Sequence, residues 1–203
     1  MKIVVASKNK GKIEEISEIL HDMGVGVVSQ EQLNIRVDVE EDGITFEENA
    51  LKKAVTVMQI CNEVTLADDS GLEVDYLDGA PGIYSARYAG ENATDKDRNQ
   101  KLLEALKDVP REERTAKFVC AVAAVFPNGH KIIVRGECEG IINFEPVGNN
   151  GFGYDPLFYM PEYHMTMAEM DEQLKNKISH RAKALSLFKK QLKKYLFSCE
   201  NFK

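Results

Sequence analysis

Apolar residues recur at helical spacing in several segments of the chain. Between residues 10 and 20, isoleucine or leucine stands at positions 13, 16, 19 and 20, which places these side chains on one face of a helix. The same spacing predicts helices over residues 45–58, 94–106 and 179–196. A Thr-x-x-Glu capping pattern begins the second helix at Thr45, and another such pattern at Thr166 predicts an additional short helix.

Short, nearly continuous apolar runs predict buried strands over residues 2–6 and 64–67. A longer apolar run, 116–126, is followed by a Pro-Asn-Gly turn and by a second strand pattern over 131–139, which together predict a hairpin. Strands alternate with helices in one part of the chain and follow each other in another. This arrangement is typical of an α/β fold with a mixed sheet flanked by helices.

Chain length and composition favour a globular protein. The 203 residues are enough for one domain, or for one domain in two lobes around a cleft, over residues 1–203. Hydrophobic residues make up 43% and charged residues 29%, which is ordinary for a protein with a buried core. A broad nucleic-acid-binding surface needs an excess of basic residues, so the formal net charge of −7 argues against one.

The apolar run at the N-terminus is too short for a signal peptide, and no stretch approaches the roughly 18 apolar residues of a membrane helix. The four cysteines, Cys61, Cys120, Cys138 and Cys199, include no C-x-x-C pair, and at least Cys61 and Cys120 lie in apolar runs. Buried, reduced thiols are therefore expected. These features predict a cytoplasmic protein with no membrane partner.

A polar segment between the first predicted strand and helix reads Ser7-Lys8-Asn9-Lys10-Gly11-Lys12. A helix N-terminus that follows a strand presents free N–H groups and the positive end of the helix dipole, so this segment can hold phosphate. The spacing of a Walker A loop is absent. The alternative is a solvated loop in which Ser7 or Asn9 only caps the helix.

Two acidic segments could hold a hard cation such as Mg²⁺, because converging carboxylates bind such ions. One is the cluster of three acids Glu40-Glu41-Asp42, and its alternative is a plain acidic loop. The other is the pair Asp68 and Asp69, which follows the predicted strand 64–67 where α/β sheets place ligands. A carboxylate there can bind the metal or take a proton from water, and a simple turn is the alternative.

Residues 148–156 are rich in glycine and include two aromatic side chains. Glycine permits close approach of the backbone to a ligand, and an aromatic ring can stack on a nucleobase. The alternative is a tight turn with core aromatics. Further along, the segment 175–181 offers cationic and donor groups at the start of the last helix, and a capped helix with a solvated basic turn is its alternative.

Six segments, taken in order over about residues 3–190, resemble the motifs of the inosine triphosphate pyrophosphatase family. They are Ser7-x-Asn9-x-x-Lys12, Glu41-Asp42-Gly43-x-Thr45-Phe46-x-Glu48-Asn49-Ala50, Ala67-Asp68-Asp69-Ser70-Gly71-Leu72, Gly79-Ala80-Pro81-Gly82-Ile83-Tyr84-Ser85-Ala86-Arg87, Gly151-Phe152-Gly153-Tyr154-Asp155-Pro156 and Ile178-Ser179-His180-Arg181. One such segment would be a weak sign. Six in order are highly specific to this family.

The resemblance implies a fold and an activity. The fold is α/β, with two lobes around a long central mixed sheet, a nucleotide in the cleft and a homodimeric assembly. The activity is Mg²⁺-dependent hydrolysis of deaminated purine nucleoside triphosphates, namely ITP, dITP and XTP, to the monophosphate and pyrophosphate. Such an enzyme clears these nucleotides from the pool.

The resemblance also implies roles for single residues. Asp69 is the expected general base and a metal ligand, Glu41 or Glu40 completes the metal site, and Asp68 is a further candidate ligand. Residues 7–12 and Lys53 are expected to hold the triphosphate. The remaining substrate-binding residues are expected to be Ser70, Phe152, Gly153, Tyr154, Asp155, Lys175, His180 and Arg181.

Within this set, Arg181 is the candidate reader of the 6-oxygen of hypoxanthine or xanthine. A guanidinium donates hydrogen bonds and cannot accept one from the 6-amino group of adenine. One position departs from the family pattern, because Asn150 stands where many members have glycine. Since asparagine also tolerates positive φ, we expect no consequence.

Other functions are compatible with parts of the sequence. One is a pyrophosphatase that acts on another nucleotide, such as dUTP or a triphosphate with a methylated base. Another is a catalytically silent nucleotide-binding regulator, against which the intact acidic set of Glu41, Asp68 and Asp69 argues. A nucleic-acid-binding module is the least compatible with the acidic net charge.

Overall fold

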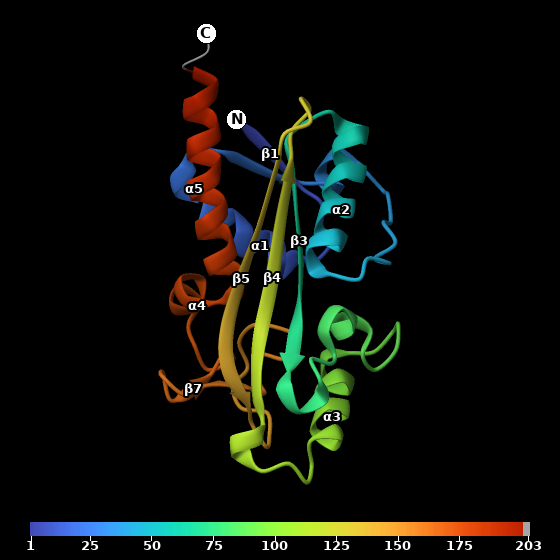
Figure 1. Cartoon of the computed structure of the whole chain (residues 1–203), viewed down its shortest axis with the longest axis vertical. Helices are drawn as coiled ribbons and strands as arrows, with labels where there is room; N and C mark the ends of the chain where they lie inside the picture. Colours follow the sequence, from blue (N-terminus) through green and yellow to red (C-terminus); the bar gives the residue numbers. More distant parts are fainter. Residues whose placement is uncertain (201–203) are drawn as a thin grey trace. The chain divides into compact units, whose positions relative to one another are not determined.

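The computed structural model describes residues 1–200, with side chains described through residue 198. Within these residues, seven strands form one sheet in the order β2-β1-β3-β4-β5-β6-β7 (Figure 1). The strands are β1 (Lys2–Val5), β2 (Gly26–Ser29), β3 (Thr65–Val74), β4 (Thr115–Val125), β5 (Lys131–Ile142), β6 (Phe158–Met160) and β7 (Met165–Thr166). Strand β1 pairs in parallel with β2 and β3, whereas β6 pairs antiparallel with β5 and β7. The predicted mixed α/β sheet is therefore confirmed.

The α-helices of the described residues are α1 (Lys10–Leu20), α2 (Phe46–Cys61), α3 (Asp95–Ala105), α4 (Glu172–Ile178) and α5 (His180–Glu200). Of these, α1, α2, α3 and α5 are the four that apolar spacing predicts. Short 3₁₀ helices lie at η1 (His21–Met23), η2 (Glu31–Leu33), η3 (Asp75–Leu77), η4 (Gly82–Arg87) and η5 (Arg111–Glu113). The hydroxyl of Thr45 accepts a hydrogen bond from the amide of Glu48 (3.1 Å), so the predicted N-cap of α2 is confirmed.

The short helix predicted after Thr166 is wrong. Thr166 ends β7, and its N–H donates to the carboxylate of Glu169 (2.7 Å), which closes a turn. The next helix, α4, begins only at Glu172, and Asp171 caps it by accepting from the amide of Leu174 (2.7 Å). A Thr-x-x-Glu pattern satisfies the backbone of a turn equally well when no periodic apolar run follows it.

The strand predicted over 64–67 is longer than expected, because β3 runs on through Asp68, Asp69, Ser70 and Gly71. The alternative of a turn at this point is therefore wrong, and the acidic pair lies within the strand instead of beyond its end. Successive residues of a strand point to opposite faces of a sheet. The two aspartate side chains are consequently directed to different faces.

The chain folds into two compact units. Unit 1 contains Met1–Asp69, Cys120–Gly136 and the segment from Arg181 onward, and unit 2 contains Ser70–Val119 and Glu137–His180. The boundaries fall inside the long strands β3, β4 and β5. In unit 1, α1 and α5 lie on one side of the sheet and α2 on the other (Figure 1).

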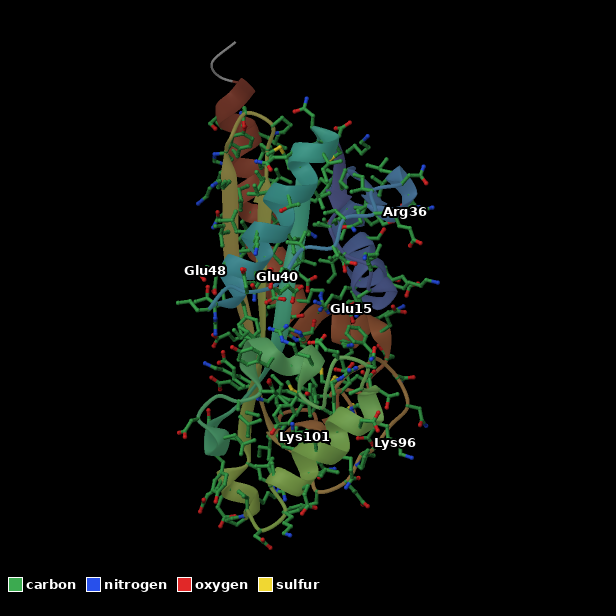
Figure 2. The ribbon with its side chains drawn as sticks, turned by 90° about the vertical axis from the view of Figure 1, so that its right-hand side faces the viewer. Glu15, Arg36, Glu40, Glu48, Lys96 and Lys101 are labelled. Atoms are coloured by element: carbon green, nitrogen blue, oxygen red, sulfur yellow. The ribbon has the colours of Figure 1, made fainter. Side chains whose placement is uncertain are left out.

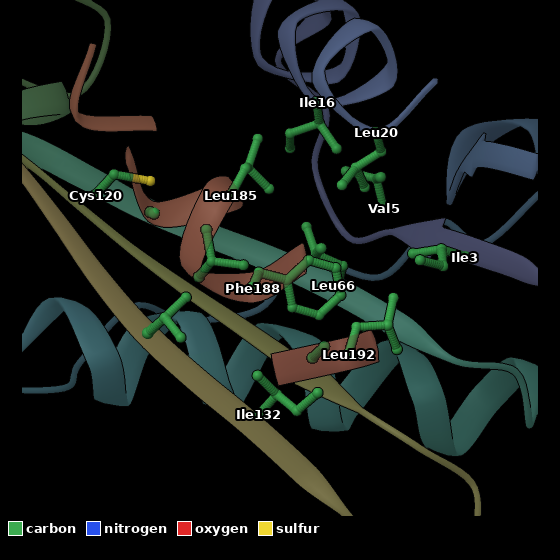
Figure 3. Packing of buried hydrophobic residues seen from close by; sticks show 14 of the residues in the cluster. Ile3, Val5, Ile16, Leu20, Leu66, Cys120, Ile132, Leu185, Phe188 and Leu192 are labelled. Atoms are coloured by element: carbon green, nitrogen blue, oxygen red, sulfur yellow. The ribbon is translucent and has the colours of Figure 1, made fainter. Parts of the chain in front are cut away.

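The core of unit 1 joins the sheet to α1 and α5. Figure 3 shows Leu66 of β3 among side chains that include Ile16 of α1 and Phe188 of α5, all fully buried. Burial of one such side chain contributes about 1.5–3 kcal/mol. Cys120 lies in the same core, where burial raises the pKa of its thiol to about 12, so it serves as a packing residue.

Cys120 and Cys138 are buried, reduced thiols, as expected, whereas the reduced Cys61 is only partly buried. The side chain of Cys199 lies outside the described part. In unit 2, the ring of Phe118 packs against Phe158 and stacks on the imidazole of His180, with ring centroids 4.3 and 4.8 Å apart. Among the described residues, no helix is both long and apolar enough to cross a membrane.

Candidate active site

The segment 7–12 forms the N-terminus of α1. Asn9 is the N-cap, since its Oδ1 accepts from the amide of Lys12 (3.2 Å), and the amide of Asn9 donates to the hydroxyl of Ser7 (3.2 Å). Asn9 therefore caps α1, and the other free N–H groups of the first turn can still bind an anion. Lys8 and Lys10 are exposed, whereas the side chain of Lys12 turns inward.

Asp68 is the centre of a buried charge cluster in unit 1. One oxygen of its fully buried carboxylate lies 3.1 Å from the ammonium of Lys12 and 3.1 Å from a guanidinium nitrogen of Arg181. Arg181 also donates to the carboxylate of Glu15 on α1 (Figure 2 labels Glu15). Burial alone would raise the pKa of Asp68, but Lys12 and Arg181 outweigh it and hold the pKa well below its ordinary value. Asp68 is thus fixed as an anion.

Asp69 meets a different set of groups, on the α2 side. Its carboxylate accepts from the ammonium of Lys53 (3.0 Å) and from the side-chain amide of Asn49 (3.3 Å), both on α2. The same ammonium lies 2.8 Å from the carboxylate of Glu41. Burial raises the pKa of Asp69, and the nearby lysines offset only part of that effect.

The two adjacent aspartates therefore differ in proton affinity. The pKa of Asp68 is depressed, whereas the pKa of Asp69 is raised, because their surroundings differ on the two faces of β3. A pair of titratable groups whose pKa values are pushed apart is typical of an acid–base site. Of the two carboxylates, Asp69 is the one able to accept a proton from a neighbouring molecule.

Glu41 and Asp69 also form the best candidate for a metal site. Both carboxylates lie within hydrogen-bond distance of the single ammonium of Lys53, so they converge on one point. No group of three or more His, Cys, Asp or Glu side chains suited to a metal ion occurs in the described part. Mg²⁺ is commonly held by one or two carboxylates together with waters and substrate phosphates, so this pair fits it. Glu40 is exposed beside the start of α2 (Figure 2).

In unit 2, Asp155 organises the glycine-rich segment. Its buried carboxylate accepts from the ammonium of Lys175 (2.8 Å) and from the amide of Phe152 (2.9 Å). The ammonium of Lys175 lies 4.8 Å from the centroid of the Phe152 ring, within cation–π range. Gly151 has φ of +73°, and a Cβ there would come within 2.1 Å of an oxygen of Asp155, so only glycine fits.

Residues 3–191 match the Ham1 family model. The chain belongs to the Ham1 family. It is 54% identical to the dITP/XTP pyrophosphatase of Desulforamulus reducens, over 91% of this chain and 92% of the relative, and 51% identical to that of Clostridium perfringens, over 95% and 97%. The structure of a HAM1 protein from Coxiella burnetii is 44% identical with a TM-score of 0.87, and covers 96% of this chain and 99% of its own. The predicted family resemblance is confirmed.

In this Ham1 family chain, the departure at Asn150 has a different explanation from the expected one. Asn150 does not adopt positive φ. Its backbone N–H donates to the carbonyl of Ala168 (3.0 Å), and its side-chain amide donates to the backbone carbonyl of Met170 (3.0 Å). Asn150 therefore fixes the backbone before Gly151 through these two hydrogen bonds. Its tolerance of positive φ plays no part, because its φ is not positive.

The position of Arg181 bears on its expected role. Arg181 is 1% exposed, and its Nε, Nη1 and Nη2 atoms all donate to Asp68 or Glu15. This geometry favours a role in holding Asp68. Contact with the 6-oxygen of the base stays a prediction.

The remaining expected residues are dispersed over the two units. Ser70 is partly exposed on β3, and His180 is buried against Phe118. Sequence reasoning assigned no role to Asn49 or Glu15, which hold Asp69 and Arg181. Both are buried polar residues next to apolar positions on a helix, and that placement was the available signal.

Replacement of Asp68 by asparagine should destabilise the fold at neutral pH by about 3 kcal/mol, because it leaves buried cations without their anion. The folded-state pKa of Asp68 is depressed, so its contribution is complete above the unfolded value near 3.9 and is lost as pH falls toward the folded value. Below pH ~3.9 the difference between the two proteins should shrink by about 1.4 kcal/mol per pH unit. Urea unfolding at pH 7 and pH 3 measures it.

The matched control is Asp22→Asn, which removes an exposed carboxylate that pairs with Lys189 on the surface. This variant should follow the wild-type curves at both pH values. A stability gap for Asp68→Asn that stays constant or widens in acid would contradict the assignment of Asp68 as a buried anion.

Proposed function

We propose that this chain hydrolyses the deaminated purine nucleoside triphosphates ITP, dITP and XTP to the monophosphate and pyrophosphate, and so clears them from the nucleotide pool. The observation that carries the proposal is the buried Asp69, with a raised pKa, beside Lys53 and Glu41. Membership of a family with curated relatives named dITP/XTP pyrophosphatase supports the choice of substrate.

Binding of the triphosphate is assigned to groups of unit 1. The N-terminus of α1, residues 7–12, offers backbone N–H groups, and the ammonium groups of Lys12 and Lys53 add positive charge. These groups bind the triphosphate and offset the negative charge that develops on the leaving pyrophosphate. Lysine recognises this charge without reading the identity of the base.

Asp69 acts as the general base. It takes a proton from a water molecule whose oxygen attacks the α-phosphorus, and the bond from that phosphorus to the bridging oxygen breaks. The electron pair of that bond leaves with pyrophosphate, so no covalent intermediate forms. Asp68 stays ionised and keeps Lys12 in place.

We assign Glu41 and Asp69 as the residues that would hold Mg²⁺. The alternatives are weaker, since Glu40 is exposed and Asp68 is occupied by Lys12 and Arg181. A bound Mg²⁺ supplies charge neutralisation at the phosphate oxygens. Asn49 would orient the carboxylate of Asp69, because it donates to the oxygen that Lys53 does not contact.

We assign binding of the base and sugar, as the family resemblance implies, to Ser70, Phe152, Gly153, Tyr154, Asp155, Lys175 and His180. The paired Asp155 and Lys175 hold the backbone and ring of Phe152, which suits an aromatic surface for a purine. We also propose a cytoplasmic homodimer, as the family resemblance implies. Size-exclusion chromatography with light scattering tests the assembly.

The wild-type protein with Mg²⁺ should release pyrophosphate, and not orthophosphate, from ITP and XTP, with GTP and ATP poor substrates. Phosphorus NMR of the products identifies the bond that is cleaved. The same assay with dUTP and with triphosphates of methylated bases as substrates distinguishes this activity from that of a pyrophosphatase for another nucleotide. Orthophosphate as the first product, or no turnover of any triphosphate, would contradict the proposal.

Asp69→Asn should lower kcat for ITP by at least ~10²-fold through loss of the general base. Its melting temperature should equal or exceed that of the wild type. Burial raises the pKa of Asp69, which means that the folded state holds the charged form at a cost that asparagine removes. Near-normal turnover would exclude Asp69 as the base. The matched control is Asp42→Asn, which alters an exposed acid of the same region.

Arg181→Ala should lower kcat/KM for ITP and ATP by the same factor, at least ~10-fold, because Asp68 and Lys12 would lose their support on the phosphate side. Steady-state kinetics on both nucleotides measures the ratio. A much larger loss on ITP would instead support the predicted contact with the 6-oxygen. Lys189→Ala, on the same helix α5 but in a surface ion pair, should leave both values unchanged.

A further inference from the structure

Gly153 is held at both of its polar groups by one helix of unit 2. Its N–H donates to a carboxylate oxygen of Asp95 (2.8 Å), and its carbonyl oxygen accepts from the side-chain amide of Asn99 (3.1 Å). Asp95 and Asn99 are four residues apart on α3, so their side chains emerge on the same face. Together they form a clamp on a single backbone residue.

The clamp restricts a backbone that packing at Gly153 leaves free. Gly153 has φ of +64°, and a Cβ built on it would meet nothing within 4 Å. Its N–H belongs to the peptide plane shared with Phe152, and its carbonyl belongs to the plane shared with Tyr154. Because glycine is conformationally permissive, the two hydrogen bonds set the direction in which the neighbouring side chains leave the backbone.

Packing alone does not explain why an asparagine is buried at position 99. Asn99 is 6% exposed, and its Oδ1 has no hydrogen-bond partner among the described residues. A buried acceptor without a partner destabilises a fold, and an apolar side chain would avoid that cost. The bond from its Nδ2 atom to Gly153 is the gain that accounts for asparagine at this position.

The clamp is itself anchored to neighbouring elements of unit 2. The guanidinium of Arg98 donates to the carboxylate of Asp95 and to the carbonyl of Ala86 in η4, the latter at 3.0 Å. The hydroxyl of Tyr154 donates to the carbonyl of the adjacent Ser85 (2.9 Å). Helix α3, η4 and the glycine-rich segment are therefore joined by hydrogen bonds through Gly153 and Tyr154.

We propose that Asp95 and Asn99 are positioning residues for base recognition, which hold Gly153 so that Phe152 and Tyr154 present a fixed surface to the purine. This inference rests on the proposed function, in which residues 152–155 bind the base. Asp95 and Asn99 act through Gly153 and touch neither the substrate nor the reacting atoms.

The test uses Asp95→Ala and Asn99→Ala in the full-length enzyme. KM for ITP should rise roughly 10- to 100-fold, because a displaced binding surface loses its contacts with the base. The inhibition constant of inorganic tripolyphosphate, which has no base, should change by less than about 2-fold, because the phosphate side is untouched. Hydrogen exchange without nucleotide should become faster at residues 152–154.

Two further variants separate positioning from general destabilisation. Asp97→Ala, on the same helix, removes the carboxylate that accepts hydrogen bonds from the amide and hydroxyl of Thr94 but leaves the bonds to Gly153, so it should keep the wild-type KM. Asp95→Asn retains an acceptor oxygen and should restore KM to within about 3-fold of the wild type. Asp95 is about half exposed, so its truncation leaves no cavity in the core.

Three results would overturn the inference. They are a KM for the clamp variants equal to that of Asp97→Ala, an equal weakening of tripolyphosphate inhibition, and unchanged exchange at residues 152–154. The exchange experiment needs no turnover. If the wild type releases no pyrophosphate from any triphosphate, the proposed function fails, while faster exchange in the variants would still support the clamp itself.

Discussion

Two neighbouring residues of a β-strand cannot point to the same face of a sheet, and the candidate active site depends on this constraint. Because β3 continues through Asp68 and Asp69, one carboxylate meets Lys12 and Arg181 and the other meets Lys53 and Asn49. The difference in proton affinity follows from these different partners. Had the strand ended at Ala67, a turn could have placed both acids in a similar, solvated environment.

The Asp68 cluster shows how a buried charge is made tolerable. Arg181 and Lys12 carry two positive charges, Asp68 and Glu15 carry two negative charges, and each cation contacts Asp68. Desolvation of an ion pair costs free energy that its attraction often fails to recover, so such a cluster is weak support for stability as such. Its value lies in geometry, because it fixes the side chain of Lys12 near the N-terminus of α1.

In unit 2, hydrogen bonds from other residues hold the glycine-rich backbone in place. Asp155 holds the amide of Phe152, and the α3 side chains Asp95 and Asn99 hold Gly153. Glycine is needed at position 151 because any side chain would collide with Asp155. Gly151 and Gly153 have no side chain to restrict the backbone, and hydrogen bonds from surrounding elements hold it in one conformation.

The mixed α/β class, the four main helices and the family are predictable from the sequence, because apolar periodicity and ordered motifs are local properties of the chain. The length of β3, the turn after Thr166 and the partners of Arg181 are not predictable in this way. Strand length depends on pairing with neighbouring strands, and a capping pattern fits a turn as well as a helix. The contacts of Glu15 with Arg181, and of Asp95 with Gly153, join residues 166 and 58 positions apart. Such contacts follow from the packing of whole elements against one another, and they leave no periodic pattern in the sequence from which they could be predicted.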